Sequence, residues 1–136
     1  MYKLFRYNYY KQYKFFLRIN GKDDLPQFTA MLSIAQNVLF NLNALYLIIG
    51  SLIFKPIIYL SFKDPNSSLK VIIGLILFLI PFHLVFIYRK RYLKILDEFK
   101  NESDLDNKKG NIYMIIYTIC SIIFQISGFI VLAYNH

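Results

Sequence analysis

Residues 69–88 read LKVIIGLILFLIPFHLVFIY, a stretch in which Lys70 is the one charged side chain. At about 1.5 Å of rise per residue, a helix of this length crosses the hydrocarbon core of a bilayer, which is about 30 Å thick. The stretch stops at Arg89-Lys90-Arg91, whose charges belong in water or among lipid headgroups. We therefore predict a membrane-spanning helix here.

Two further tracts predict membrane spans, because residues 28–54 and 112–134 contain no charged residue. The first follows Asp23-Asp24-Leu25-Pro26, which places acidic groups and a proline where a helix begins. Lys55-Pro56 is expected to end or kink this helix, since proline lacks the N–H group that a helix interior needs. The last tract is expected to begin after a break at Gly110-Asn111. The predicted fold is all-α, a single membrane domain with three transmembrane helices.

Composition and charge agree with a membrane protein. Hydrophobic residues make up 57% of the 136 residues although the net charge is +8, and a soluble domain of this size could not bury so much apolar surface. Lys and Arg are concentrated before the first predicted span and between the second and third. The positive-inside rule therefore predicts a cytoplasmic N-terminus and an external C-terminus. The abundance of Ile, Lys and Asn is typical of an AT-rich genome, so the bacterial inner membrane is the expected location.

The segment 1–22 is predicted to form an amphipathic helix that lies on the cytoplasmic membrane surface. Aromatic residues recur along one side of this helix and basic residues along the other. Aromatic rings suit the headgroup boundary, and each nearby Lys or Arg gains roughly 1 kcal/mol from an anionic leaflet. Nucleic-acid binding is the less favoured alternative, because the bilayer lies next to the segment. The predicted membrane-surface residues are Lys3, Arg6, Tyr9, Lys11, Tyr13, Lys14 and Arg18.

Residues 89–110 are predicted to form a helix and loop that project into the cytoplasm. Tyr92, Ile95, Leu96 and Phe99 recur at helical spacing, and charged residues surround them. The acidic end of this segment is expected to be a solvated loop. A cytoplasmic protein or a nucleotide signal is the partner that such a surface would bind, although the sequence has no glycine-rich phosphate loop.

Small and polar side chains form one stripe along the first span and another along the third. In hydrocarbon these groups need hydrogen-bond partners, which lipid does not provide. Either the two stripes pack against each other within one subunit, or several subunits gather them around a pore as a homo-oligomer. Gln36 and Asn43 lie together on a flank of the first stripe. The candidate pore or helix-packing residues are Ser33, Asn37, Asn41, Ser51, Thr118, Ser121, Gln125 and Gly128.

His83 lies two residues after Pro81 in the second span, where histidine is uncommon. It is a candidate gate or proton site, and the alternative is a neutral histidine bonded to a carbonyl that Pro81 leaves free. No Asp, Glu, Lys or Arg lies at mid-span, which argues against a coupled transporter. His83 and His136 have no companions at catalytic or metal-ligand spacing, so we predict no catalytic, cofactor-binding or metal site and no enzyme.

Residues 94–103, KILDEFKNES, followed by Lys108-Lys109-Gly110-Asn111 and a span, resemble a recurring pattern in small bacterial multi-span membrane proteins. The resemblance covers about a quarter of the chain. It implies a membrane protein and carries no assigned chemistry.

Two functional hypotheses follow from these patterns. In the first, subunits associate through the polar stripes into a pore-like membrane effector, similar in architecture to bacterial phage-defence effectors that permeabilise the inner membrane. In the second, the protein is a non-conducting accessory, such as an anchor, an immunity protein or a subunit of a larger complex. The polar stripes then only hold helices together. We expect the first, with the second as its alternative.

Overall fold

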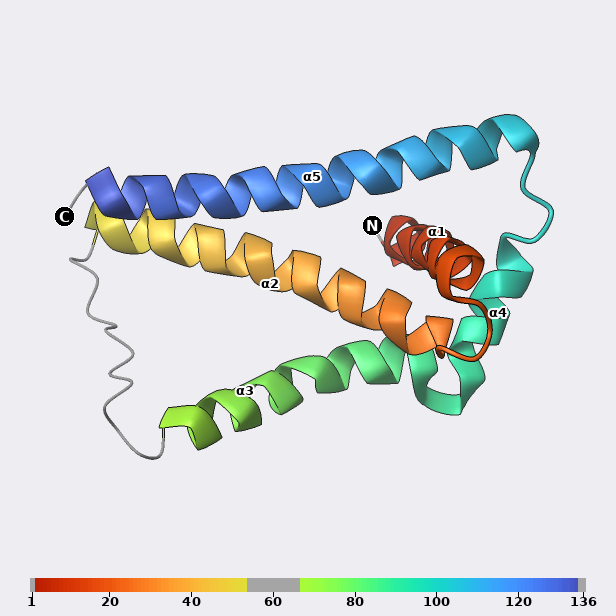
Figure 1. The fold of residues 1–136 in the computed structure, drawn as a ribbon, viewed down its shortest axis with the longest axis horizontal. Helices are drawn as coiled ribbons and strands as arrows, with labels where there is room; N and C mark the ends of the chain where they lie inside the picture. Colours follow the sequence, from red (N-terminus) through yellow and green to blue (C-terminus); the bar gives the residue numbers. More distant parts are fainter. Residues whose placement is uncertain (1, 54–66, 135–136) are drawn as a thin grey trace.

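A computed structural model describes residues 2–53 and 67–134, which form helices and connecting turns and contain no strand (Figure 1). The predicted all-helical class is confirmed for these residues. The predicted helix end at Lys55-Pro56 lies outside them. The elements are α1 (Tyr2–Asn20), α2 (Pro26–Ile53), α3 (Ser67–Phe82), the π-helix η1 (His83–Ile87), the 3₁₀-helix η2 (Tyr88–Lys90), α4 (Arg91–Glu98) and α5 (Asp104–Tyr134).

Three helical runs are long and apolar enough to cross a membrane, as the sequence predicted. They lie within Pro26–Ser51, Ser68–Glu98 and Asp104–Tyr134. The second run is not straight, because Arg89 (φ 53°) and Lys90 (φ 56°) adopt left-handed backbone conformations. The part that can cross a bilayer therefore comes before these two residues.

The α2 and α5 helices share the most extensive contact in the molecule. Figure 1 shows them close together near the C-terminal end of α5 and diverging towards its start. The short helix α1 lies in the resulting wedge, where it contacts α2, α4 and α5. Helix α3 contacts α2 only near its C-terminal end and diverges from it towards Ser67 (Figure 1).

The chain bends after α3, where the sequence predicted a continuous helix. Pro81 cannot donate a backbone hydrogen bond, and the π-helix η1 follows it directly. The Arg91 guanidinium donates to the Leu84 carbonyl oxygen at 3.0 Å across the bend. The positive φ angles of Arg89 and Lys90 then reverse the chain direction, so α4 packs back against α1 and does not extend away from the spans.

The hydrophobic core lies where α1 meets α2, η1 and α4. Tyr9 and Phe86 are fully buried, and their rings stack at a centroid distance of 4.4 Å. Met31 and Ile34 of α2 and Ile95 of α4 complete the cluster. The aromatic side of α1 therefore packs inside the protein, where the sequence analysis had placed it against lipid headgroups.

Helix α5 begins at Asp104 and runs through Gly110-Asn111 without interruption, so the predicted break at this pair is wrong. Ser103 caps the start: its hydroxyl accepts a hydrogen bond from the Asp106 N–H at 3.2 Å and donates to the Asp106 carboxylate at 2.7 Å. The third apolar helix thus has a polar first portion that reaches α1. We call the region formed by α1, α4 and residues 99–110 the α1 junction.

Candidate functional site

A buried ion pair between Lys11 and Glu102 holds the α1 junction together. Their side chains are 1% and 7% exposed, and the Lys11 Nζ lies 2.5 Å from Glu102 Oε2. The same ammonium donates to Asn107 Oδ1 at 2.8 Å and to the Asn107 carbonyl oxygen at 3.2 Å. All three of its protons therefore have acceptors, which is the condition for a buried charge to be tolerated.

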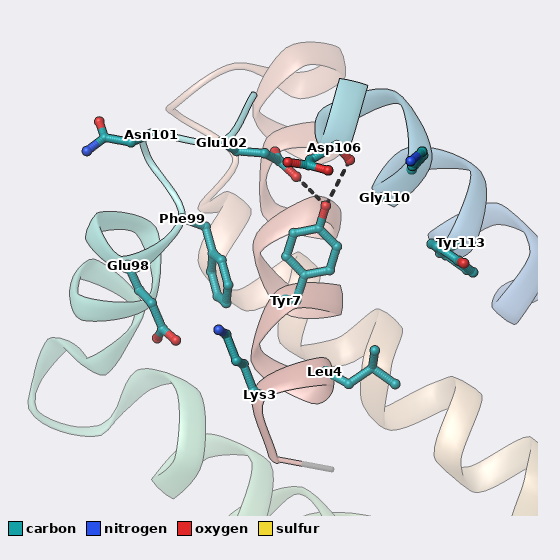
Figure 2. A pocket seen from close by; sticks show the side chains of 11 residues that line it. Lys3, Leu4, Tyr7, Glu98, Phe99, Asn101, Glu102, Asp106, Gly110 and Tyr113 are labelled. Atoms are coloured by element: carbon teal, nitrogen blue, oxygen red, sulfur yellow. Dashed lines mark hydrogen bonds between the residues drawn. The ribbon is translucent and has the colours of Figure 1, made fainter. Parts of the chain in front are cut away.

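Tyr7 completes this network from the preceding turn of α1. Its hydroxyl donates to the Glu102 carboxylate and lies 3.1 Å from the Asp106 carbonyl oxygen (Figure 2). Burial raises the pKa of Tyr7 well above its ordinary value, and the hydrogen bond to the Glu102 carboxylate raises it further. The phenol thus stays protonated and acts as a donor, which makes it a structural group and not a base.

Gly110 allows α1 to approach α5 this closely. A Cβ atom at position 110 would collide with Tyr7 Oη and Lys11 Cε. The glycine that suggested a helix break is therefore explained by close packing. Glycine costs roughly 1 kcal/mol relative to alanine inside a helix, and here the absence of a side chain makes room for the ion-pair network.

An open groove of about 710 Å³ lies beside this network, between α1, α4 and the start of α5. Figure 2 shows Tyr7 and Phe99 side by side in it, with Glu98 at one side. The groove is lined by Lys3, Leu4, Tyr7, Glu98, Phe99, Asn101, Glu102, Asp106, Lys109, Gly110 and Tyr113. Among the described residues no group of His, Cys, Asp and Glu could hold a metal ion. The groove thus offers a mixed polar and aromatic surface.

The predicted membrane-surface residues of α1 lie in two environments. Lys3, Lys14 and Arg18 are exposed, and Tyr13 is half-buried. Arg6 forms an ion pair with Glu98. Tyr9 and Lys11 are buried inside the protein, so these two cannot contact headgroups as predicted. Helical spacing predicts that α1 has an aromatic side and a basic side. It does not predict that other helices of the same protein cover the aromatic side.

The two predicted polar stripes meet within one chain. Asn37 is 3% exposed, and its amide donates to Thr118 Oγ1 at 3.4 Å. One turn further, the Asn41 amide lies 3.5 Å from Tyr117 Oη. Ser121 is 2% exposed, and its hydroxyl donates to the Tyr117 carbonyl oxygen at 3.0 Å. The structure therefore brings Asn37, Asn41, Thr118 and Ser121 together between α2 and α5.

Of the remaining stripe residues, Gly128 lies at the same interface. A Cβ atom at Gly128 would come within 3.1 Å of Ala44 Cα, so the two helices are in near backbone contact there. Ser51 donates to the Ile48 carbonyl oxygen at 3.1 Å, and Ser33 is half-buried. Gln125 has a buried Oε1 atom without a hydrogen-bond partner in the described structure.

His83, the candidate gate or proton site, is exposed at the start of η1. No hydrogen bond or ion pair joins its imidazole to another described residue. Within 2–53 and 67–134 the imidazole therefore has no partner for either of the two predicted roles.

Gln36 and Asn43 lie outside the α2–α5 interface. Gln36 is exposed and Asn43 is half-buried, and neither side-chain amide makes a hydrogen bond to another residue within 2–53 or 67–134. These two amides therefore differ from Asn37 and Asn41, although they lie on the same helix.

The sequence patterns do not predict the roles of Tyr7, Glu102 and Asn107 in this network, nor the close packing at Gly110. Glu102 and Lys11 are separated by 91 positions, so no local pattern joins them. A usable signal is the position of Lys11, which lies on the side of α1 that carries Tyr7 and Tyr10. An ammonium buried among aromatic rings needs a carboxylate from elsewhere in the chain.

Comparison of the chain with protein-family models, curated proteins and solved structures finds no match.

Proposed function

We propose that this chain is a non-enzymatic accessory protein of the bacterial inner membrane that presents the groove of the α1 junction to a cytoplasmic protein. The observation that carries this proposal is the groove itself, about 710 Å³ in volume. Its walls are fixed by the Lys11–Glu102 ion pair and by the hydrogen bond from Tyr7. A fixed, open surface beside the membrane suits docking better than chemistry.

The distribution of charge supports a cytoplasmic position for this groove. All but three of the 16 Lys and Arg residues belong to α1, to the turn after it, or to residues 89–109. The positive-inside rule places such segments in the cytoplasm. The surplus of positive charge there also favours an anionic leaflet beneath the exposed Lys3, Lys14 and Arg18.

The shape and lining of the groove favour a peptide segment as its occupant. Small-molecule sites are usually enclosed, whereas this groove is open along one side. Leu4, Phe99 and Tyr113 offer apolar contact, and Lys3, Lys109 and Asp106 add charges of both signs. A segment of a partner protein that carries apolar and charged side chains would match both features.

The burial of the predicted pore residues supports an accessory over a channel. Asn37 and Ser121 are enclosed between α2 and α5 of a single chain. Lining a central path with them would require these two helices to separate and lose the close contact at Gly128. In the accessory role, the same side chains only hold the helices together.

Photo-crosslinking in the native membrane tests the proposal. A photoreactive amino acid replaces Asn101 or Lys109 in the groove, and Leu75, which is 44% exposed on α3, serves as the matched control position. We expect a discrete protein adduct from positions 101 and 109 and none of that mass from position 75. Adducts of identical mass from all three positions, or none from the groove, would contradict docking at this site.

A membrane-permeabilising effector is the second candidate, because Gln36 and Asn43 leave polar groups on the outer side of α2. Copies that gathered these amides could surround a water-filled path. Ion flux through liposomes that contain the purified protein separates the two candidates. The accessory role predicts flux equal to that of empty liposomes.

A further inference from the structure

The outer side of α2 carries a row of polar and small residues that the chain itself leaves uncovered. Gln36, Asn43 and Gly50 follow one another at intervals of seven residues. Gln36 is exposed and Asn43 is half-buried, and their side-chain amides make no hydrogen bonds to other described residues. A Cβ atom at Gly50 would meet nothing within 4 Å. This row is therefore not explained by packing within one chain.

Unpaired amides are unfavourable on a surface that faces lipid. A side-chain amide without a hydrogen bond in an apolar medium costs several kcal/mol, on the order of 4–8 by transfer to cyclohexane. The exposed sides of the other two apolar helices avoid this cost. In 71–80 of α3 and 112–130 of α5 no exposed residue carries a side-chain amide, and large aliphatic residues such as Ile76 and Ile123 are exposed there. The outer side of α2 is thus the exception.

Apolar residues accompany this row at a second fixed spacing. Leu32, Leu39 and Tyr46 each precede a member of the row by four residues and are 47%, 37% and 46% exposed. Residues that alternate at intervals of four and three form the a and d positions of a heptad repeat. Gln36, Asn43 and Gly50 then occupy a, and Leu32, Leu39 and Tyr46 occupy d. Such a seam packs against another helix in a left-handed coiled coil.

The α2 helix of a second copy can supply the hydrogen-bond partners that these amides lack. An amide group both donates and accepts hydrogen bonds, so Asn43 can pair with Asn43 of another copy, and Gln36 with Gln36. Two copies inserted in the same direction hold their α2 helices parallel, which brings equal positions together about a two-fold axis. Gly50 lets the backbones come close at one end of the seam, as small residues do between membrane helices.

We propose that the chain forms a homodimer in the membrane through the outer side of α2, with Gln36, Asn43 and Gly50 at the centre of the interface. The α2–α5 contact and the α1 junction stay intact in each subunit, because they use other sides of these helices. This interface does not depend on the proposed docking role of the groove. A dimer would present two grooves on the same side of the membrane.

Cysteine crosslinking of the full chain in liposomes locates the interface. Cys120 is exposed and is first replaced by serine. Single cysteines are then placed at position 43 or 50 on the outer side of α2, and at position 76 on α3 or 123 on α5 as controls. We expect oxidation to give covalent dimers from positions 43 and 50 only. Dimers that form equally from position 76 or 123 would overturn the proposed interface.

The strength of association gives the second measurement. A Cβ atom added at Gly50 or at Gly74 would meet nothing within 4 Å, so the two glycines form a matched pair for substitution. Gly50→Leu is expected to weaken the dimer by at least about tenfold, and Gly74→Leu to leave it unchanged, in energy-transfer measurements at increasing lipid dilution. Replacing both Gln36 and Asn43 by leucine is expected to weaken the dimer to a similar extent.

Folding of each variant is followed by circular dichroism, and these changes are expected to leave it intact because they lie on an exposed side. A wild-type chain that remains monomeric at every lipid dilution would overturn the proposal. Association that Gly50→Leu and Gly74→Leu weaken equally would overturn it too, since the interface would then not be specific to α2.

Discussion

The α1 junction and the contact between the apolar helices α2 and α5 both bury polar side chains, but these side chains find hydrogen-bond partners in different ways. In the junction, the Lys11 ammonium has three acceptors at 2.5 to 3.2 Å. Between α2 and α5, the Asn37 amide has one partner at 3.4 Å, and Gln125 Oε1 has none in the described structure. Charge-assisted bonds therefore define the geometry of the junction, whereas backbone contact at Gly128 defines that of the spans.

The two regions therefore differ in how strongly their stability depends on a single residue. In the junction, removing one group leaves a buried charge without a partner, and water cannot replace it without opening the core. Between membrane helices, a lost hydrogen bond costs less, because the separated helices in the bilayer also find other partners. We expect substitutions in the junction to have the larger effects on stability.

Lys11→Met makes the sharpest test of the junction. It preserves the unbranched chain beside Tyr7 and Tyr10 but leaves the Glu102 carboxylate buried and unpaired. We expect the free energy of unfolding to fall by about 3–5 kcal/mol. Unfolding of the detergent-solubilised protein, followed by circular dichroism against increasing denaturant, measures this loss.

The double variant Lys11→Met with Glu102→Gln is the control. It replaces the unpaired charge by a neutral amide, which Tyr7 can still contact as a donor. We expect it to recover part of the lost stability. A loss below about 1 kcal/mol in the single variant would show that the ion pair is solvated, and the contrast with the spans would disappear.

The sequence predicted the three apolar helices of the fold better than it predicted the α1 junction. Charge-free tracts mark membrane spans because charged side chains are costly in hydrocarbon, so three apolar helices followed from composition alone. The position of α1 could not be predicted this way. Its aromatic side suits both a headgroup layer and a protein core, and the choice depends on Phe86, which lies far away in the sequence.

The same limit applies to the candidate sites. Helical periodicity predicted that Asn37 and Asn41 share a side of α2, and the structure places both against α5. Periodicity gives the direction of a side chain but not its neighbour, so it left packing within one chain and pore formation as equal alternatives. The ion pair of Lys11 with Glu102 could not be predicted from local sequence patterns, because it forms only when α1 packs in the wedge between α2 and α5.

Tyr7→Phe tests the junction through the pH dependence of folding stability. The folded-state pKa of Tyr7 is raised, so folding strengthens proton binding, and this contribution is complete below the ordinary tyrosine pKa of about 10. Stability should therefore decrease as the pH rises above about 10. Tyr7→Phe is expected to cost about 1.5 kcal/mol at neutral pH and to reduce this alkaline loss.

Thermal unfolding at pH 8 and at pH 11 measures both effects. Tyr113→Phe is the matched control, because Tyr113 lines the same groove but is 70% exposed. Tyr9, whose pKa burial also raises, is present in both variants and contributes equally to their alkaline loss. Identical pH profiles for the wild type and Tyr7→Phe would show that the phenol does not contribute to the network.

Asn37→Leu tests the contact between α2 and α5, where we expect the smallest loss of stability. Thr118 keeps its own hydrogen bond to the Met114 carbonyl oxygen at 3.0 Å, so the substitution leaves no donor unpaired. The expected loss is about 0.6 kcal/mol, measured by the same denaturant titration. Asn43→Leu on the outer side of α2 should leave the stability of the monomer unchanged, since the Asn43 side chain has no partner in the described chain.

A loss above about 2 kcal/mol in Asn37→Leu would place the contact of Asn37 with Thr118 in the same class as the ion pair of the junction. The polar groups of the spans would then hold the helices together, and close packing at Gly128 would be secondary.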